Sequence, residues 1–308
     1  MYMLFQLILN FRTIKNSKIK KEKVMLKPIG KHIYYLDHQP ETDRPLLAAV
    51  VGEKHCLMID SGNSPAHAEL FQVELQNVTE KKIDIVALTH WHWDHTFGLQ
   101  AIDAVSVAHD LTKARLKEYQ SFAWDNEALD QRVRDGIEIE FCQEMIKKEL
   151  PDRSNLHIQT PVITFDKSLE VDLGGISCRI EHIGGDHAED SSVIYIPEEK
   201  MVFLGDCLSP DFYSGSWSYD SSKLEKVIEQ VRSYNANWYA TSHDHVETKA
   251  ELFKYLDQLQ QLSKIAEDYL SEQEMLTKFK EEVHRSPNEE EKELLDYFLQ
   301  GNRKKEKQ

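Results

Sequence analysis

A short run of histidine and aspartate at residues 90–95 is the part of this sequence best suited to chemistry. Four potential metal ligands fall within these six residues: His90, His92, Asp94 and His95. In an extended turn His90 and His92 point to the same side, because alternate residues share a face, and the next turn can carry Asp94 and His95 toward a second position. Imidazole and carboxylate together suit zinc, and less specifically iron or manganese. A polar loop explains one incidental histidine, whereas three histidines and an aspartate at this spacing predict a metal site.

Short apolar runs and helical patterns alternate around this segment. The run IDIVALTH (83–90) ends directly in it, which indicates a buried strand that leads into a site. Further strands are predicted at 46–52, 55–60, 105–109, 162–165, 169–173, 176–183, 192–196, 201–206 and 238–243. Helices are predicted within 65–78, 111–150, 224–231 and 252–262, and in a last short helix around 289–300 that Gly301 caps.

Strands on both sides of a helical block, followed by strand–helix alternation, indicate two sheets with helices outside them. This order predicts an α/β chain with αββα layering. At 308 residues the chain allows one large domain or two modest ones, and its 41% apolar content is that of an ordinary globular protein.

The charge balance and the cysteines narrow the classes of partner and location. Lys and Arg total 37 against 53 Asp and Glu, a net charge of −16, which argues against a nucleic-acid partner. No apolar run reaches the roughly eighteen residues that a membrane-spanning helix needs. Cys56, Cys142, Cys178 and Cys207 are scattered without a Cys-x-x-Cys pair, which favours reduced thiols and a cytoplasmic location. We expect a small-molecule substrate, with neither nucleic acid nor membrane as partner.

Residues 1–24 differ in pattern from the rest of the chain. Residues 1–9 are apolar and residues 12–23 are rich in Lys and Arg, which is the reverse of a secretory signal. From Met25 the chain reads as an ordinary domain start. We therefore interpret 1–24 as an extension outside the fold, from an upstream start codon; the rival interpretation is a peripheral membrane anchor.

Five motifs in order resemble those of the metallo-β-lactamase superfamily. The H-x-H-x-D-H pattern at 90–95 is the most specific of them. The others are Asp60 in LMIDSG, His187 in GGDHAEDSS, Asp206 in VFLGDCL and His243 in ATSHDH. The resemblance spans about residues 28–245. It implies a four-layer αββα sandwich over 25–246, with a helical insertion at 111–150 and a C-terminal helical segment at 247–308.

The resemblance also implies a dinuclear centre. One ion would be held by His90, His92 and His187, and the other by Asp94, His95 and His243, with Asp206 bridging both. Asp60 would hydrogen-bond near the ligands and orient them. All seven ligand positions carry the usual residue types, so two Zn²⁺ per chain are the expected cofactors, with iron or manganese as alternatives.

Hydrolysis is the chemistry that such a centre implies. Two cations about 3.5–4 Å apart share a water and lower its pKa, so that a bridging hydroxide attacks a carbonyl or phosphoryl centre. Asp94 is the expected proton acceptor or relay. The prediction is a hydrolase of a small or medium ester, thioester, lactone or amide. The alternatives are a mononuclear-iron sulfur dioxygenase-like oxidoreductase, which the complete second ligand set argues against, and a β-lactam hydrolase.

Aromatic and basic residues near the motifs are candidate substrate contacts. Three lie in the loop after Asp206, where aromatics often meet ligands: Tyr213, Trp217 and Tyr219. Weaker candidates in the helical block are Tyr119, Trp124, Arg132 and Arg134, which an amphipathic outer helix explains equally well.

Three further interpretations concern residues beside the motifs. Cys207 is expected to be a packed thiol and not a ligand, because neighbours in extended chain point opposite ways. The family pattern favours His243 over His245 as the last ligand, although alternation alone does not separate them. His109 is expected to be a hydrogen-bonded structural residue. The leucine stripe in 252–262 either closes the domain or forms a contact in a homo-oligomer.

Overall fold

The computed structural model describes residues 25–267 and 269–307. The predicted extension at 1–24 lies outside these residues. A seven-stranded sheet has the order β1-β2-β3-β4-β5-β6-β7, and a six-stranded sheet has the order β13-β12-β11-β10-β9-β8. Strands of the first sheet are β1 (Lys27–Ile29), β2 (Ile33–Leu36), β3 (Leu47–Val51), β4 (Cys56–Ile59), β5 (Ile85–Ala87), β6 (Val105–His109) and β7 (Ile163–Phe165). Strands of the second are β8 (Ser168–Asp172), β9 (Ser177–His182), β10 (Ser192–Ile196), β11 (Met201–Gly205), β12 (Trp238–Thr241) and β13 (Val246–Thr248).

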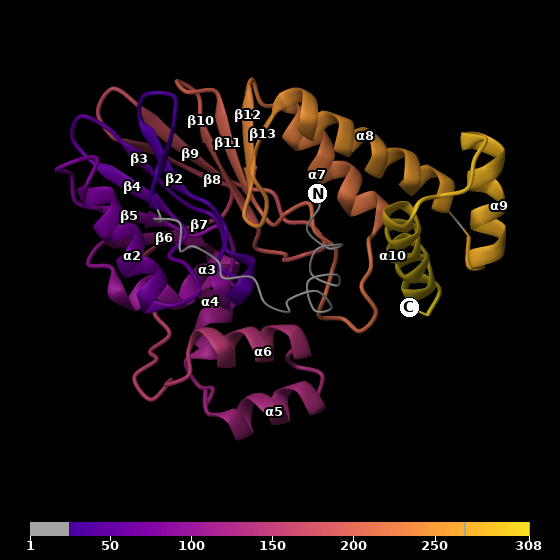
Figure 1. Cartoon of the computed structure of the whole chain (residues 1–308), viewed down its shortest axis with the longest axis horizontal. Helices are drawn as coiled ribbons and strands as arrows, with labels where there is room; N and C mark the ends of the chain where they lie inside the picture. Colours follow the sequence, from indigo (N-terminus) through magenta and orange to yellow (C-terminus); the bar gives the residue numbers. More distant parts are fainter. Residues whose placement is uncertain (1–24, 268, 308) are drawn as a thin grey trace, which may run out of the picture.

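Helices lie outside both sheets (Figure 1). Those associated with the first sheet are α2 (Pro65–Gln76), α3 (Trp93–Thr96), α4 (Asp110–Tyr119), α5 (Asn126–Arg134) and α6 (Glu140–Glu149), with short 3₁₀ turns η1 (Pro40–Thr42) and η2 (Phe97–Ala101). Those associated with the second are α7 (Ser221–Ser233), α8 (Lys249–Ala266), α9 (Glu272–Val283) and α10 (Glu289–Glu306).

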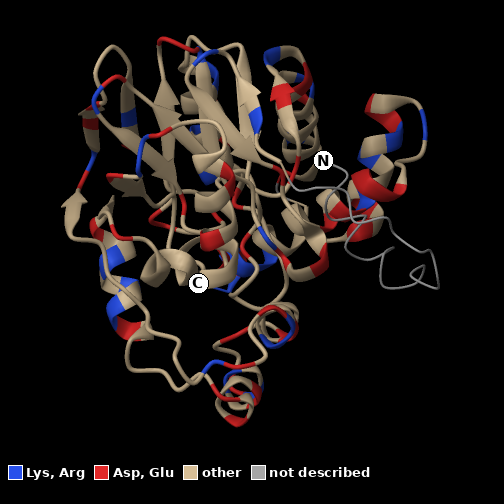
Figure 2. Cartoon of the chain, turned by 60° about the vertical axis from the view of Figure 1, so that its left-hand side comes forward, with Lys and Arg blue, Asp and Glu red and all other residues tan. Residues whose placement is uncertain are grey.

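Three apolar clusters hold these layers together. One lies between the sheets and includes Leu57 and Phe203. A second joins the outer face of the first sheet to its helices through Phe71, and a third joins the other sheet to α7–α10 through Val227 and Phe298. Charged residues of both signs gather on the helices and loops, whereas the strands are mostly uncharged (Figure 2). The predicted αββα layering is confirmed.

Each predicted strand region contains a strand, but three strands were not predicted. They are β1, β2 and β13, which have only three or four residues each. The residues of β1 (KPI) and β13 (VET) form neither an apolar run nor an alternation long enough to indicate a strand. They form because antiparallel neighbours supply their hydrogen bonds: β2 pairs with β3, and β13 pairs with β12.

The prediction that Gly301 caps the last helix was wrong. Helix α10 continues to Glu306, and Gly301 lies inside it. A Cβ atom on Gly301 would lie 1.9 Å from the backbone oxygen of Tyr219. The glycine is therefore explained by close approach of the helix to the loop before α7, where Tyr219 N–H also donates to the Tyr297 carbonyl at 3.0 Å.

The leucine stripe of α8 is buried within the chain. Its four side chains are at most 1% exposed and belong to the same cluster as the second sheet: Leu252, Leu256, Leu259 and Leu262. The stripe therefore closes the domain and leaves no area for contact with another copy. Among the described residues, no helix has both the length and the apolar character needed to cross a bilayer.

Gly301→Ala tests the close approach of α10. In an unhindered helix this change stabilises by about 1 kcal/mol, because alanine has the higher helix propensity. Here the methyl group meets rigid backbone, so we expect the free energy of unfolding to fall by about 1–3 kcal/mol. Urea unfolding followed by circular dichroism measures it. An unchanged or increased stability would contradict this account of Gly301.

Candidate metal centre

The predicted ligands come from strand ends that meet at one edge of the sandwich. Strands β4 and β5 are parallel, as are β11 and β12, so the carboxyl ends within each pair lie together. Asp60 follows β4, residues 90–95 follow β5, Asp206 follows β11 and His243 follows β12. His187 lies in the loop between β9 and β10. Segments far apart in sequence thereby deliver polar side chains to one place.

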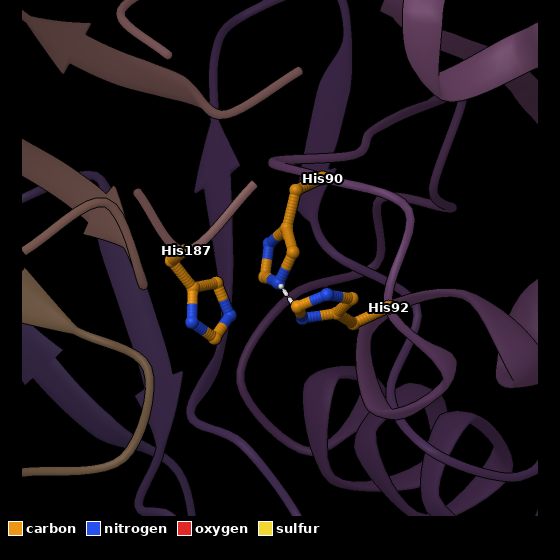
Figure 3. A group of neighbouring side chains, drawn as sticks. All are labelled: His90, His92 and His187. Carbon is orange, nitrogen blue, oxygen red and sulfur yellow. Dashed lines mark hydrogen bonds between the residues drawn. The ribbon is translucent and has the colours of Figure 1, made fainter. Parts of the chain in front are cut away.

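Three buried histidines form the first group. His90, His92 and His187 each offer a ring nitrogen, and these atoms lie within 4.8 Å of one another. Figure 3 shows His187 facing His90 and His92 from a different segment of chain, with all three rings directed into one space. His90 Nε2 and His92 Nδ1 are 3.0 Å apart. The structure thus brings together the side chains assigned to one ion.

Two histidines and two aspartates form the second group. The side chains of Asp94, His95, Asp206 and His243 again offer atoms within 4.8 Å of one another, and all four are buried. Asp94 Oδ2 lies 3.0 Å from His95 Nε2 and 3.1 Å from His243 Nε2. This group carries both carboxylates of the expected ligand set.

Asp206 connects the two groups. Its Oδ2 atom is 3.3 Å from His243 Nε2 and 3.4 Å from His95 Nε2 on one side. On the other side it is 3.5 Å from His187 Nε2 and 3.9 Å from His90 Nε2. One carboxylate oxygen therefore approaches imidazoles of both groups, and the two groups form a single centre.

Burial and charge affect the two groups differently. Burial lowers the pKa of His90 and of His92 well below the usual value. Both imidazoles are therefore neutral, and each has a nitrogen lone pair that can bind a metal ion. Burial also lowers the pKa of His95 and of His243, but neighbouring carboxylates outweigh it and raise both pKa values well above the usual value. The second group therefore attracts positive charge.

These residues fit metal ions. His92 Nε2 and both ring nitrogens of His187 are buried without a hydrogen-bond partner. Buried polar atoms without partners are costly, and a coordinated cation would satisfy His92 Nε2 and one of the two ring nitrogens of His187. The donor set of imidazole and carboxylate suits zinc, and also iron and manganese.

Asp60 holds one ligand in orientation. It accepts from the backbone N–H of Thr89 at 2.7 Å, and its Oδ2 is 2.8 Å from His95 Nδ1. A hydrogen bond from Nδ1–H to this carboxylate leaves His95 Nε2 free to face Asp94 and Asp206. Asp60 takes a left-handed backbone conformation, with φ of 56°, directly after β4.

Asp43 lies beside His243 much as Asp60 lies beside His95, and sequence reasoning missed it. Its Oδ1 is 3.4 Å from His243 Nδ1, on the side of the ring opposite the aspartates of the second group. It ends the η1 turn with a φ of 57°. No motif surrounds it in the sequence, because its approach to His243 depends on how the loop before β3 packs on the second sheet.

The structure separates His243 from its neighbour. The His245 side chain is 65% exposed, and its Nδ1 atom lies 2.6 Å from Asp244 Oδ1. His243 alone of the two reaches the second group. His109 has a structural role: its Nε2 donates to the Asp166 carbonyl at 2.7 Å, and its Nδ1 accepts from the Leu111 N–H.

Cys207 lies outside the centre. Its side chain is buried in the cluster between the second sheet and its helices, and burial raises the pKa of its thiol. The expectation of a packed thiol agrees with this placement. A buried neutral thiol is a poor ligand, since metal binding requires thiolate.

Cys207→Ala is accordingly expected to leave metal content unchanged and turnover within about twofold, with a stability loss of about 1 kcal/mol from lost packing. Elemental analysis of the purified variant measures its metal content, and an activity assay measures its turnover. Loss of one metal equivalent would contradict the assignment.

The candidate substrate contacts have different positions. Tyr213 lies beside His92, with ring centroids 5.2 Å apart, and lines a cavity of about 430 Å³ that includes His187 and Trp91. Tyr219 lines a second cavity, of about 90 Å³, that includes Asp206 and His243. Trp217 packs on Phe212 and Tyr297 and lines neither cavity.

The weaker candidates of the helical block lie in neither of these two cavities. Tyr119 and Trp124 are buried in the apolar cluster over the first sheet. The Arg132 guanidinium donates to the Ala123 carbonyl, and Arg134 contacts Gln131 on the same helix. In contrast, Arg115, which sequence reasoning missed, lines the larger cavity and stacks 4.7 Å from Trp91.

An αββα sandwich with buried histidine and aspartate groups at one edge defines a class of metal-binding fold. The chain belongs to the metallo-β-lactamase superfamily, whose sequence profile matches residues 44–243. A search of curated protein sequences found no match to this chain.

Solved structures share this fold at low sequence identity. A metallo-beta-lactamase from Pontibacter korlensis has a TM-score of 0.56 and 18% identity over 76% of this chain and 98% of its own. The DIM-1 metallo-beta-lactamase has a TM-score of 0.53 and 16% identity over 78% of this chain and 98% of its own. The sec-alkylsulfatase Pisa1 from Pseudomonas sp. has a TM-score of 0.63 and 15% identity over 91% of this chain. The match covers 49% of the alkylsulfatase, so this chain spans about half of that protein.

Proposed function

We propose that this chain is a dinuclear metal-dependent hydrolase of a small or medium ester, thioester, lactone or amide. The observation that carries the proposal is the position of Asp206. Its Oδ2 atom lies within 3.3–3.9 Å of imidazoles from both ligand groups. A shared carboxylate between two complete ligand groups is the arrangement expected for two neighbouring cations.

The residues assigned to each ion follow from the two groups. His90, His92 and His187 would hold one ion and Asp94, His95 and His243 the other, with Asp206 shared. Two bound zinc ions would supply Lewis acidity, lowering the pKa of a shared water and polarising the oxygen of the scissile group.

Residues of the chain itself orient the metal ligands and accept a proton. Asp60 fixes His95, and Asp43 lies against His243, so both imidazoles keep one orientation. Asp94 Oδ2 faces the space shared by His95, His243 and Asp206, where it can accept a proton from the nucleophile. The larger cavity, beside His187 and Trp91, gives a substrate access to the centre.

The comparisons support hydrolysis as a class. The solved structures with this fold include proteins named as β-lactamases and as a sec-alkylsulfatase, which are hydrolases. The second ligand group is complete in this chain, which favours a dinuclear hydrolase over a mononuclear-iron oxygenase.

A metal-depletion screen tests the proposal. Protein stripped with a chelator and reloaded with zinc, manganese or iron is assayed on thioesters, lactones, β-lactams, phosphodiesters and secondary alkyl sulfates, with oxygen uptake measured in parallel. We expect hydrolysis that disappears on stripping and returns with a divalent ion. Oxygen consumption with a thiol substrate, without hydrolysis of any ester, would overturn the proposal in favour of a dioxygenase.

A further inference from the structure

The cavity of about 90 Å³ beside Asp206 and His243 is not used by the mechanism above. Its walls come from the strand ends that carry these two ligands, from the following loop, and from α8 and α10. Because Asp206 and His243 belong both to the cavity wall and to the metal centre, a group bound in the cavity would keep an attached scissile bond close to the centre. The cavity is thus placed to select substrates.

The walls of the cavity are apolar and aromatic. Leu208, Leu252 and Leu294 line it together with Tyr219 and Tyr297. The tyrosine hydroxyls already have acceptors: Tyr219 donates to the Leu208 carbonyl at 2.8 Å, and Tyr297 donates to Glu293 Oε1 at 2.6 Å. Their hydroxyls are thus engaged within the protein, and a third tyrosine, Tyr255, also lines the cavity.

Carboxylates are the other feature of the walls. Glu247, Glu290 and Glu293 line the cavity, and no Lys or Arg is among its described lining residues. The nearby basic residues of α10 and the turn before it bind other carboxylates: Lys292 binds Glu289, and Arg285 binds Glu291. These three carboxylates give a negative charge to the side of the cavity that β13 and α10 form.

This negative charge is partly desolvated. Burial raises the pKa of Glu247 and of Glu290, which shows that each carboxylate has given up part of its hydration. A positively charged occupant would offset this cost through charge attraction and through the faces of the tyrosine rings. An anionic occupant would meet repulsion from these carboxylates.

The size of the cavity limits the occupant. The cavity, at about 90 Å³, is larger than the roughly 10–15 Å³ that one water needs, so it admits a small organic group. An alkylammonium group such as a trimethylammonium-ethyl arm has this size.

We propose that this cavity is a subsite for a cationic alkylammonium group of the substrate. The inference rests on the proposed function and narrows it to esters or thioesters that carry an ammonium group a few bonds from the scissile bond. Substrates with a carboxylate or phosphate at that position are disfavoured by the same residues.

Binding of a matched pair of small molecules tests the subsite without catalysis. Choline and 3,3-dimethylbutan-1-ol have the same shape and hydroxyl group and differ in the positive charge. Calorimetric titration of the zinc-loaded protein is expected to show choline binding at least about tenfold more tightly, a cation–π and charge contribution of about 1.4 kcal/mol. Equal affinities, or no binding of either molecule, would overturn the subsite.

Three variants of α10 localise the effect. Glu290→Gln and Glu293→Gln keep side-chain shape but remove charge from the cavity wall, and each is expected to weaken choline binding several-fold without changing the affinity for the alcohol. Glu289→Gln is the matched control, because Glu289 is on the same helix turn but has a 70% exposed side chain paired with Lys292. Equal weakening by the control would contradict the assignment to the cavity.

Activity then distinguishes the two proposals. Preferred hydrolysis of acetylthiocholine over its uncharged carbon isostere is the result expected if both are correct. Hydrolysis of the two thioesters at equal rates would overturn the subsite and leave the hydrolase intact. Choline binding without hydrolysis of any ester would overturn the hydrolase and leave the subsite intact.

Discussion

His92→Ala is expected to remove one metal ion per chain and to lower turnover by on the order of 10³-fold or more, because the nucleophile needs both ions. His92 belongs to the group that holds His90 and His187, and no other described histidine lies in position to replace it. The second group keeps all four of its side chains, so this variant should retain about one ion.

The control for this change is His157→Ala. His157 is exposed and belongs to neither ligand group. It should keep full metal content and turnover. Full turnover in His92→Ala would remove the mechanism, whereas a loss of activity in both variants would show an effect of histidine removal unrelated to the centre.

Asp206→Ala is expected to have a larger effect on metal content. Its carboxylate lies between the groups, so its loss removes a ligand from each ion and the negative charge that attracts them. We expect less than one ion per chain after gel filtration in buffer without added metal, and no turnover above the background. Metal content and activity, measured on the same sample, check both.

The comparison of Asp206→Ala with His92→Ala carries more information than either variant alone. A bridging role predicts that Asp206→Ala loses more metal than His92→Ala. The opposite order, with one ion still bound in Asp206→Ala, would show that Asp206 serves only one ion. Asp103→Ala, a change at an exposed aspartate, controls for loss of negative charge alone.

The positions of the ligand groups could be predicted from sequence because local and topological rules act together. His90 and His92 follow a buried strand at alternate positions, which is a local pattern. Asp206 and His243 meet because β11 and β12 are parallel and their carboxyl ends share an edge. The family resemblance supplied the assignment of each residue to an ion, which spacing alone does not give.

Other features depend on packing between distant segments and could not be predicted. Gly301 has the residue type of a helix cap, and only the approach of α10 to Tyr219 explains why it lies within the helix. Asp43 comes from a loop without a motif and reaches His243 through tertiary structure. The smaller cavity combines residues of α8, α10 and two strand ends, so no local pattern indicates it.

The measurement that tests the central claim most directly is elemental analysis of the purified protein by mass spectrometry, together with turnover of the same sample. We predict two divalent ions per chain, zinc by preference, with ion content and hydrolysis lost together on chelation and recovered together on reloading. One iron per chain with oxygen consumption, or full hydrolysis by protein that contains no metal, would contradict the account.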